Sequence, residues 1–371
     1  MNVRSLEVSN FRNIETLSFE PGEGVNVIYG ENAQGKSNLL EAIWLFTGLR
    51  SFRGSKDREL IRFGEEQAGL DLVFDNDVRE MTAGLTIGEK KKAVLGGVPQ
   101  ETVNRFMGEF LAIVFAPSNL ELVRGGPSER RKFLNQTLCQ LKPNYAHRLA
   151  QFNKILQQRN ILLKDLTYHS ELYDTLEIWD ERFASFAAYL ILEREAYLKA
   201  LRPSLLDFYE GISGGREEID VQYDTGHAYE SKDGPSLKEE VLQQLMLNRK
   251  EDLAAGFSTI GPHRDDLSVL LNGVPVKAYG SQGQQRSAAL SLKMAEAAVI
   301  RDLTGKQPVA LLDDVMSELD IHRQDYILNH IEGWQVFITC CEPTDILKSK
   351  CGTGNMFEIK DGKLCSSISA S

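Results

Sequence analysis

Short apolar runs, separated by Asn, Pro and Gly, dominate the first part of the chain. They predict strands at residues 3–8, 14–19 and 25–29, the last of them almost continuously apolar. Further strands are expected between about residues 68 and 98, where Gly84 and Gly96-Gly97 provide the turns. Residues 111–115 have the composition of a buried core strand. This part of the chain is therefore expected to be rich in sheet.

The pattern changes to a helical period in the middle of the chain. From about residue 127 to 205 glycine is almost absent, and apolar residues recur every three or four positions. One series begins at Leu149, and a second runs from Leu172 to Leu190 in alternating steps of four and three, like a heptad seam. The polar residues 167–170 between them predict an antiparallel helical hairpin. Two ordinary helices of an α domain would give much the same pattern.

Strand character returns after a glycine- and aspartate-rich segment at residues 211–235, which is expected to be irregular, and a helix at residues 237–247. Strands are predicted at residues 257–260 and 267–271, with Asn272–Gly273 as a hairpin turn, and a long helix follows Ser281. The expected architecture is an α/β head of mixed sheets and helices, interrupted by a mainly α-helical arm. The predicted parts are residues 1–125 and 256–371 for the head and residues 126–255 for the arm.

A loop with the spacing GxxxxGK[ST] follows the strand at residues 25–29 and precedes a helix-like run at residues 38–46. This context allows the loop to bind phosphate, because its backbone N–H groups converge at a helix N-terminus. Lys36 would reach the β- and γ-phosphate oxygens, and the Ser37 hydroxyl would ligate Mg²⁺. The sequence therefore predicts a nucleoside triphosphate site formed by Gly30, Glu31, Asn32, Ala33, Gln34, Gly35, Lys36 and Ser37.

An apolar strand at residues 309–312 ends in two acids, as the second acidic motif of such an ATPase does. Asp313 is expected to hold Mg²⁺ beside Ser37, and Asp314 to polarise the attacking water, with Lys36 as its catalytic partner at the phosphates. The acids lie far from the phosphate loop in sequence, which an insertion that loops out would explain.

A small, hydroxyl-bearing turn, Gly280-Ser281-Gln282-Gly283-Gln284, opens the long helix that precedes the acidic strand. N–H groups at a helix N-terminus together with a serine hydroxyl form an anion site. Since the chain already has one phosphate loop, a second anion site is most simply explained if it serves the nucleotide of another subunit. An ordinary capped helix start is the alternative.

Together these motifs resemble the ABC-type ATPase heads of SMC-like DNA-repair proteins. Residues 280–284 stand where those heads have LSGGQ, and residues 317–320 resemble their D-loop. Within that group the chain is identified as a member of the bacterial RecF family by further stretches that span its whole length. These stretches are residues 6–13, 117–135, 261–266 and 311–323.

The resemblance implies a cytoplasmic recombination mediator that dimerises on ATP and binds double-stranded and gapped DNA. Such proteins work with RecR and RecO to load RecA onto single strands coated with SSB, and they are slow, DNA-dependent ATPases that use ATP and Mg²⁺. Arg12 matches a position that contacts nucleotide phosphates in related heads, and Ser281, Gly283 and Gln284 match the signature motif. Asp314 replaces the usual glutamate, so hydrolysis should be slow.

Two other positions depart from the wider ABC pattern. The strand at residues 335–339 ends in Thr339-Cys340 where transporter-type heads place a switch histidine, and Asn119 is only a weak candidate for the Q-loop glutamine. His263 and Arg264 lie in a polar cluster for which a structural network is at least as good an explanation as function.

The net charge of −11 opposes DNA binding. Local basic clusters could still form the contact, and two matching clusters would face one groove in a dimer. Arg130 and Arg131 are the leading candidates, with Lys56 and Arg58 behind them. The competing interpretation is that Arg130 and Arg131 brace the arm against the head, and single basic clusters are more often solvated faces.

Composition limits the alternatives. Five cysteines without CxxC spacing argue against a zinc or disulfide framework, and a reducing cytoplasm is the expected compartment. No signal peptide or apolar run of membrane-spanning length is present, so no membrane partner is expected. The remaining alternatives are the nucleotide-binding subunit of an ABC transporter, another SMC-type structural or zinc-hook ATPase, and a P-loop kinase.

Overall fold

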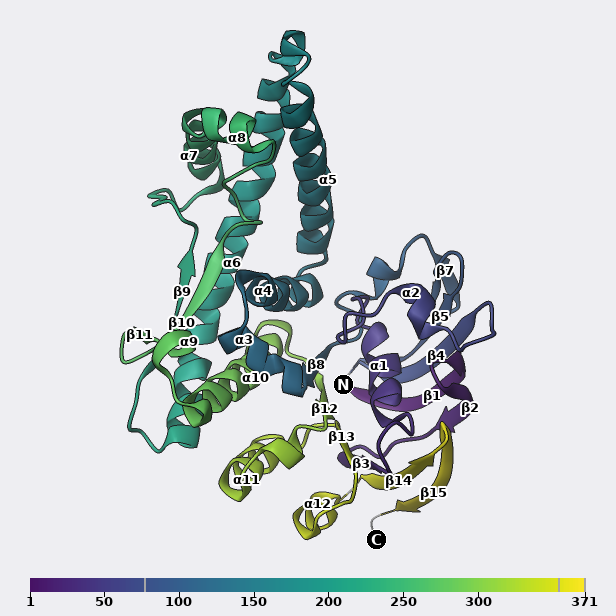
Figure 1. Cartoon of the computed structure of the whole chain (residues 1–371). Helices are drawn as coiled ribbons and strands as arrows, with labels where there is room; N and C mark the ends of the chain where they lie inside the picture. Colours follow the sequence, from purple (N-terminus) through teal and green to yellow (C-terminus); the bar gives the residue numbers. More distant parts are fainter. Residues whose placement is uncertain (77, 353, 370–371) are drawn as a thin grey trace. The chain divides into compact units, whose positions relative to one another are not determined.

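The chain folds into two compact units, drawn in Figure 1. The computed structural model describes residues 1–76, 78–352 and 354–369. One unit, the head, consists of Met1–Asn119 and Leu290–Ser371, and the other, the arm, is Leu120–Ala289. These limits differ from the expected ones, because residues 256–289 group with the arm. The cause is strand pairing: β10 (Asp266–Leu271) runs antiparallel to β9 (Ile219–Asp224) along its whole length.

The first sheet of the head is antiparallel and has the strand order β2-β1-β4-β5-β6-β7. Strands β4 and β5 alternate buried residues with half-buried or exposed ones, since one face covers the core of the head. The early strand predictions are confirmed, except that Gly84, expected in a turn, lies within β5. The strands are β1 (Asn2–Phe11), β2 (Ile14–Phe19), β4 (Ala68–Asp75), β5 (Glu80–Ile87), β6 (Lys92–Leu95) and β7 (Val98–Gln100).

The second sheet has the order β15-β14-β3-β13-β12-β8, in which β3, β13, β12 and β8 are parallel and β13, β12 and β8 are fully buried. Phe19 joins the two sheets, packing against Phe337 and Phe357 with ring centroids 5.9 and 4.6 Å apart. Because parallel strands end at the same edge, residues that follow β3, β12 and β13 meet there. The strands are β3 (Val25–Tyr29), β8 (Ala112–Phe115), β12 (Val309–Asp313), β13 (Val336–Cys340), β14 (Asn355–Lys360) and β15 (Lys363–Ser369).

Short helices complete the head. The helix after β3 carries mostly buried residues, as expected for a helix that covers a parallel sheet. The head helices are α1 (Lys36–Leu45), α2 (Asp57–Leu60), α11 (Ile321–His330) and α12 (Asp345–Lys350), and α10 (Gln282–Thr304) begins in the arm and continues into the head.

The arm is built on the predicted helical hairpin. Helices α5 and α6 lie side by side in Figure 1, and Leu163 and Leu176 pack together at their joined ends. The hairpin prediction is confirmed, although α6 continues well beyond the predicted seam. The arm helices are α3 (Glu121–Arg124), α4 (Pro127–Leu141), α5 (Pro143–Asp165), α6 (Thr175–Ser213), α7 (Gly234–Leu247), α8 (Arg249–Ala255) and α9 (Val276–Tyr279).

A small antiparallel sheet, β11-β10-β9, also belongs to the arm, with β11 at Val274–Pro275. The hairpin turn Asn272–Gly273 is confirmed, since both residues have positive φ angles of 49° and 78°. Two predictions were wrong. The segment expected to be irregular contains β9, and residues 257–260 form no strand because they contribute to a buried polar network instead.

That network explains the arginine that interrupts the apolar series of α5. Arg159 is fully buried and pairs with Asp180 and Asp252 at 2.7 and 2.6 Å. It also donates a hydrogen bond to Ser258 Oγ. Buried charges are tolerated when they are paired in this way, so the cluster fixes how α5, α6 and α8 pack. Within the described residues, no helix combines the length and apolarity needed to cross a bilayer.

Candidate nucleotide-binding site

The phosphate loop lies between β3 and α1 and has the backbone that its glycines permit. Gly35 has a φ angle of 112°, and Ala33, with a φ of 64°, also adopts the left-handed conformation. The Lys36 ammonium donates hydrogen bonds of 2.7 Å to the carbonyl oxygens of Gly30 and Glu31. The lysine is therefore held across its own loop, where a phosphate oxygen would offer a stronger, charge-assisted partner.

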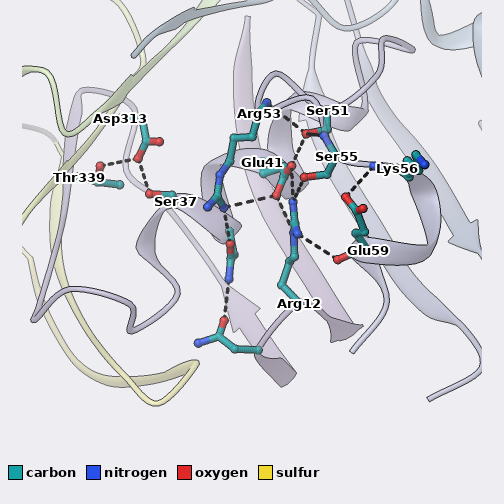
Figure 2. Close-up of polar contacts among 12 residues, drawn as sticks. Arg12, Ser37, Glu41, Ser51, Arg53, Ser55, Lys56, Glu59, Asp313 and Thr339 are labelled. Atoms are coloured by element: carbon teal, nitrogen blue, oxygen red, sulfur yellow. Dashed lines mark hydrogen bonds and ion pairs between the residues drawn. The ribbon is translucent and has the colours of Figure 1, made fainter. Parts of the chain in front are cut away.

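Ser37 and Asp313 lie in contact although 276 positions separate them. The Ser37 hydroxyl donates a 2.6 Å hydrogen bond to Asp313 Oδ1, and the Thr339 hydroxyl donates a second one of 2.9 Å (Figure 2). Both contacts follow from the sheet, since β12 and β13 are parallel and pair Asp313 with Thr339, and β13 also runs parallel to β3, the strand that leads into the phosphate loop. Hydroxyl and carboxylate oxygens are the hard ligands that Mg²⁺ takes, so the two predicted ligands fit that ion.

Asp314 is the exposed residue that follows this buried strand. Its φ angle of 53° is uncommon for a residue other than glycine, and its N–H donates a 2.9 Å hydrogen bond to Thr339 Oγ1. Thr339 thus connects both acids. The sequence had marked Thr339 only as a departure from the switch histidine, because its role depends on strand pairing that one sequence does not show.

Arg12 lies in the β1–β2 turn, again with a positive φ angle of 56°. Its guanidinium forms a two-pronged ion pair with Glu41, with both N–O distances at 3.0 Å. It also donates to the Glu59 carbonyl and to Ser55 Oγ (Figure 2). Glu41 is fully buried, is 3.7 Å from Arg53 and accepts a bond from Ser51.

Glu41 was missed by the sequence analysis. The signal was present, since an acid within the apolar run Leu39–Leu45 must be paired if that helix is buried. The partners could not be named, because they come from a separate turn and from the segment after α1.

A groove of about 1270 Å³ opens beside Arg12, Asn13 and Asn38. Its walls carry charges of both signs, and Phe63 in its lining is fully exposed. Arg58, predicted as a DNA contact, also lines this groove, while neighbouring Lys56 is exposed at the start of α2. The groove therefore lies next to the phosphate loop, since Asn13 in its lining donates a hydrogen bond to the Gln34 carbonyl of that loop.

The turn at residues 280–284, which we call the signature turn, belongs to the arm unit. Ser281 is exposed, and Gln284 is half-buried one turn further along α10. The conformation at Gly280 leaves no room for a side chain, since an added Cβ would lie 2.7 Å from the Val276 carbonyl oxygen. Gly283 is half-buried in the same first turn. The expected anion-binding elements, a serine hydroxyl and a helix start, are both present.

Arg130 and Arg131, the leading candidates for DNA contact, form hydrogen bonds inside the arm. Arg130 is only 6% exposed and forms a two-pronged pair with Asp266 at 2.7 and 2.8 Å. Arg131 donates a 2.7 Å bond to the Asp265 carbonyl, and burial lowers its pKa. This geometry favours the alternative in which both arginines brace the protein, here α4 against β10 within the arm.

His263 has a structural environment as well. Its Nε2 lies 3.1 Å from the Ser258 carbonyl, and burial lowers its pKa to about 4. Arg264 is within 3.4 Å of the same carbonyl. Asn119 accepts a bond from the Ala116 N–H in its own turn, which is a local role.

Comparison with known proteins decides the family. Residues 2–102 match the RecF/RecN/SMC N terminal domain. The chain is 39% identical over 364 residues to the DNA replication and repair protein RecF of Lachnoclostridium phytofermentans and 40% identical over 365 residues to that of Caldanaerobacter subterraneus. Both alignments cover 98% of this chain and 99% of the relative. The chain belongs to the RecF family.

Solved structures support the same assignment. The recombination mediator protein RecF–ATPrS in the RecFOR pathway has a TM-score of 0.92 and 38% identity, covering 99% of this chain and 98% of that RecF chain. An Smc head domain from Pyrococcus furiosus, at 15% identity and a TM-score of 0.55, shares the fold alone. The predicted RecF resemblance and the ABC-type α/β head are confirmed. Membership of the RecF family replaces the transporter-subunit, zinc-hook and kinase alternatives.

Proposed function

We propose that this RecF-family protein is a recombination mediator that dimerises on ATP, binds duplex and gapped DNA and helps load RecA at single-strand gaps. RecR and RecO are its proposed protein partners. The observation that carries the proposal is the 2.6 Å contact of Ser37 with Asp313, which assembles a phosphate loop and an acidic strand in one head. Relatives named as DNA replication and repair proteins over their full length supply the biological setting.

The nucleotide is proposed to bind with its phosphates at Gly30–Ser37 and its nucleoside in the groove beside Arg12. Lys36 would exchange the Gly30 and Glu31 carbonyls for phosphate oxygens. The pairing with Glu41 orients the Arg12 guanidinium at the groove wall, from which it can approach a phosphate. Mg²⁺, held by Ser37 and Asp313, would neutralise charge on the phosphates.

Hydrolysis is assigned to Asp314. Its carboxylate would accept the proton of the attacking water while Asp313 stays with the metal. The side chain is one methylene shorter than the glutamate of the wider ABC group, which places the base farther from the water. We therefore propose slow hydrolysis, stimulated by DNA, that acts as a switch.

The dimer is proposed to place Ser281, Gly283 and Gln284 of one protomer at the nucleotide of its partner. DNA contact through Lys56 and Arg58 is supported by their exposure, and a dimer would double their number. Contacts would go to the phosphate backbone with little sequence preference. A cytoplasmic location is proposed as well, and is supported by five free thiols.

Sedimentation of the purified protein tests this function. The unmodified chain should be a monomer alone, a dimer with ATP and Mg²⁺, and a larger complex when duplex DNA is added with ATP. ADP is the matched control and should leave a monomer. Monomers under every condition, with ATP shown to be bound, would contradict the proposal.

A further inference from the structure

The signature turn is closed on itself in this structure. Gln284 N–H donates to the Ser281 hydroxyl oxygen at 3.3 Å, while Ser281 N–H donates to Gln284 Oε1 at 2.6 Å. This reciprocal arrangement is a capping box, in which each of two residues at a helix start donates its backbone N–H to the side-chain oxygen of the other. The N–H and the hydroxyl that would meet a phosphate are thus both engaged locally.

A carboxylate outside the turn holds this arrangement in place. Gln284 Nε2 donates a 2.5 Å hydrogen bond to Glu217 Oε1, and Glu217 Oε2 accepts a 2.6 Å bond from the Tyr209 hydroxyl. Tyr209 is 1% exposed and lies near the end of α6, so one end of this chain of contacts is fixed in the arm core. Glu217 precedes β9, in the segment that the sequence analysis had expected to be irregular.

We infer that Glu217 is a positioning residue that holds the signature turn in its closed arrangement and thereby opposes ATP-driven dimerisation. We call the contacts of Glu217 with Gln284, and of Gln284 with Ser281, the latch. The inference rests on the proposed function, in which Ser281 serves the nucleotide of the partner. The carboxylate orients the Gln284 carboxamide so that its oxygen covers the Ser281 N–H. A γ-phosphate must displace that oxygen before it reaches the helix start.

Charge acts in the same direction as geometry. Only the Gln284 carboxamide separates the Glu217 carboxylate from the Ser281 N–H. An incoming γ-phosphate carries negative charge, so the carboxylate repels it while the latch is closed. Release of Gln284 from Glu217 would free the Ser281 N–H, and the helix start would then favour the anion.

The test uses Glu217→Gln in the full-length chain. Glutamine keeps an acceptor for the Tyr209 hydroxyl or for Gln284 but removes the charge. The ATP concentration for half-maximal dimer, measured by sedimentation, should fall roughly three- to tenfold, as expected when one charge near the phosphate is removed. Affinity of the monomer for a fluorescent ATP analogue should not change, since the latch lies outside the phosphate loop's own unit.

Glu218→Gln is the matched control, because it removes the same charge from an exposed neighbour. It should leave the dimerisation curve unchanged. Equal curves for Glu217→Gln and the unmodified chain, or a weaker dimer in Glu217→Gln, would overturn the latch. An unmodified chain that binds ATP and never dimerises would overturn the proposed function instead, which keeps the two failures distinct.

Amide exchange in the unmodified chain gives a second, independent measurement. Overlapping peptides across residues 277–286 should show the Ser281 amide protected without ATP, although amides at helix starts ordinarily exchange fast. Unprotected exchange at Ser281 would contradict the latch even if the variant failed to fold.

Discussion

Arg12 and Glu41 form a two-pronged ion pair whose acid is fully buried beneath the β1–β2 turn. The pair joins the turn to α1, the helix that begins at the end of the phosphate loop. The Arg12–Glu41 pair therefore supports the phosphate loop on the side of the proposed nucleoside groove. Neither the segment around Arg12 nor the segment around Glu41 predicts this contact by itself.

Glu41→Gln should destabilise the head. The variant leaves the Arg12 guanidinium without its charge partner at a largely buried site, and breaking such pairs costs on the order of 3 kcal/mol. Chemical denaturation measures the change in free energy of unfolding. Glu23→Gln is the control, since its pair with Arg4 is exposed and should contribute less than about 0.5 kcal/mol. Equal effects of the two variants would contradict the assigned role of Glu41.

Asp314→Asn should retain ATP and accumulate the dimer, because the metal ligand Asp313 remains while the base is lost. Removal of a general base typically lowers the rate about 100-fold or more. Phosphate release and sedimentation with ATP measure the two effects. Asp325→Asn, an exposed acid on α11, should hydrolyse ATP at the parental rate. Parental hydrolysis in Asp314→Asn would move the base elsewhere.

Charge reversal of Lys56 and Arg58 should weaken duplex binding at ATP concentrations that saturate the variant, since Arg58 also lines the proposed nucleoside groove. Losing two phosphate contacts should reduce the slope of log affinity against log salt by about 2 per protomer. Anisotropy across a salt series provides the measurement, and the paired reversal of exposed Lys199 and Lys363 is the control. An unchanged slope would exclude this cluster, and a loss seen only with Arg131→Glu would return the contact to the arm.

Acid should destabilise the arm through His263. Its folded-state pKa of about 4 lies below the ordinary 6.5, so the unfolded chain binds the proton first and stability falls from pH 6.5 toward 4. Between pH 7.5 and 5 this contributes a loss of about 2 kcal/mol, which His263→Gln should abolish relative to the parent. The pKa of Asp265, raised to about 6 by burial, acts in the opposite direction, so the parent–variant difference is the useful quantity. His147→Gln, exposed on α5, should keep the loss.

Local signals predicted much of this fold. The phosphate loop, the strand before Asp313 and the Asn272–Gly273 turn follow from residues adjacent in sequence, so one chain suffices to place them. β9 could not be predicted in the same way, because it exists as a strand through pairing with β10, more than 40 positions later. The Glu41 partners, the Thr339 link and the Glu217 contact are equally non-local. Arg130 shows the limit of local signals, since a residue of a basic cluster in sequence is largely buried and paired with Asp266 in the fold.

The central claim is that Ser281 of one protomer completes the nucleotide site of the other. Ser281→Arg should therefore bind ATP normally and yet remain a monomer, because its side chain fills the space for the partner's γ-phosphate. Ser236→Arg, the same substitution at the start of α7 in the same unit, should dimerise like the parent.

Mixing variants tests the claim most directly. Lys36→Ala lacks the positive charge that binds the phosphates but keeps its signature turn. Ser281→Arg keeps its phosphate loop but has an altered signature turn. Each should sediment as a monomer with ATP, whereas an equimolar mixture should form dimers that contain one intact composite site. Dimerisation of Ser281→Arg alone, or a mixture that stays monomeric while ATP is bound, would contradict the account.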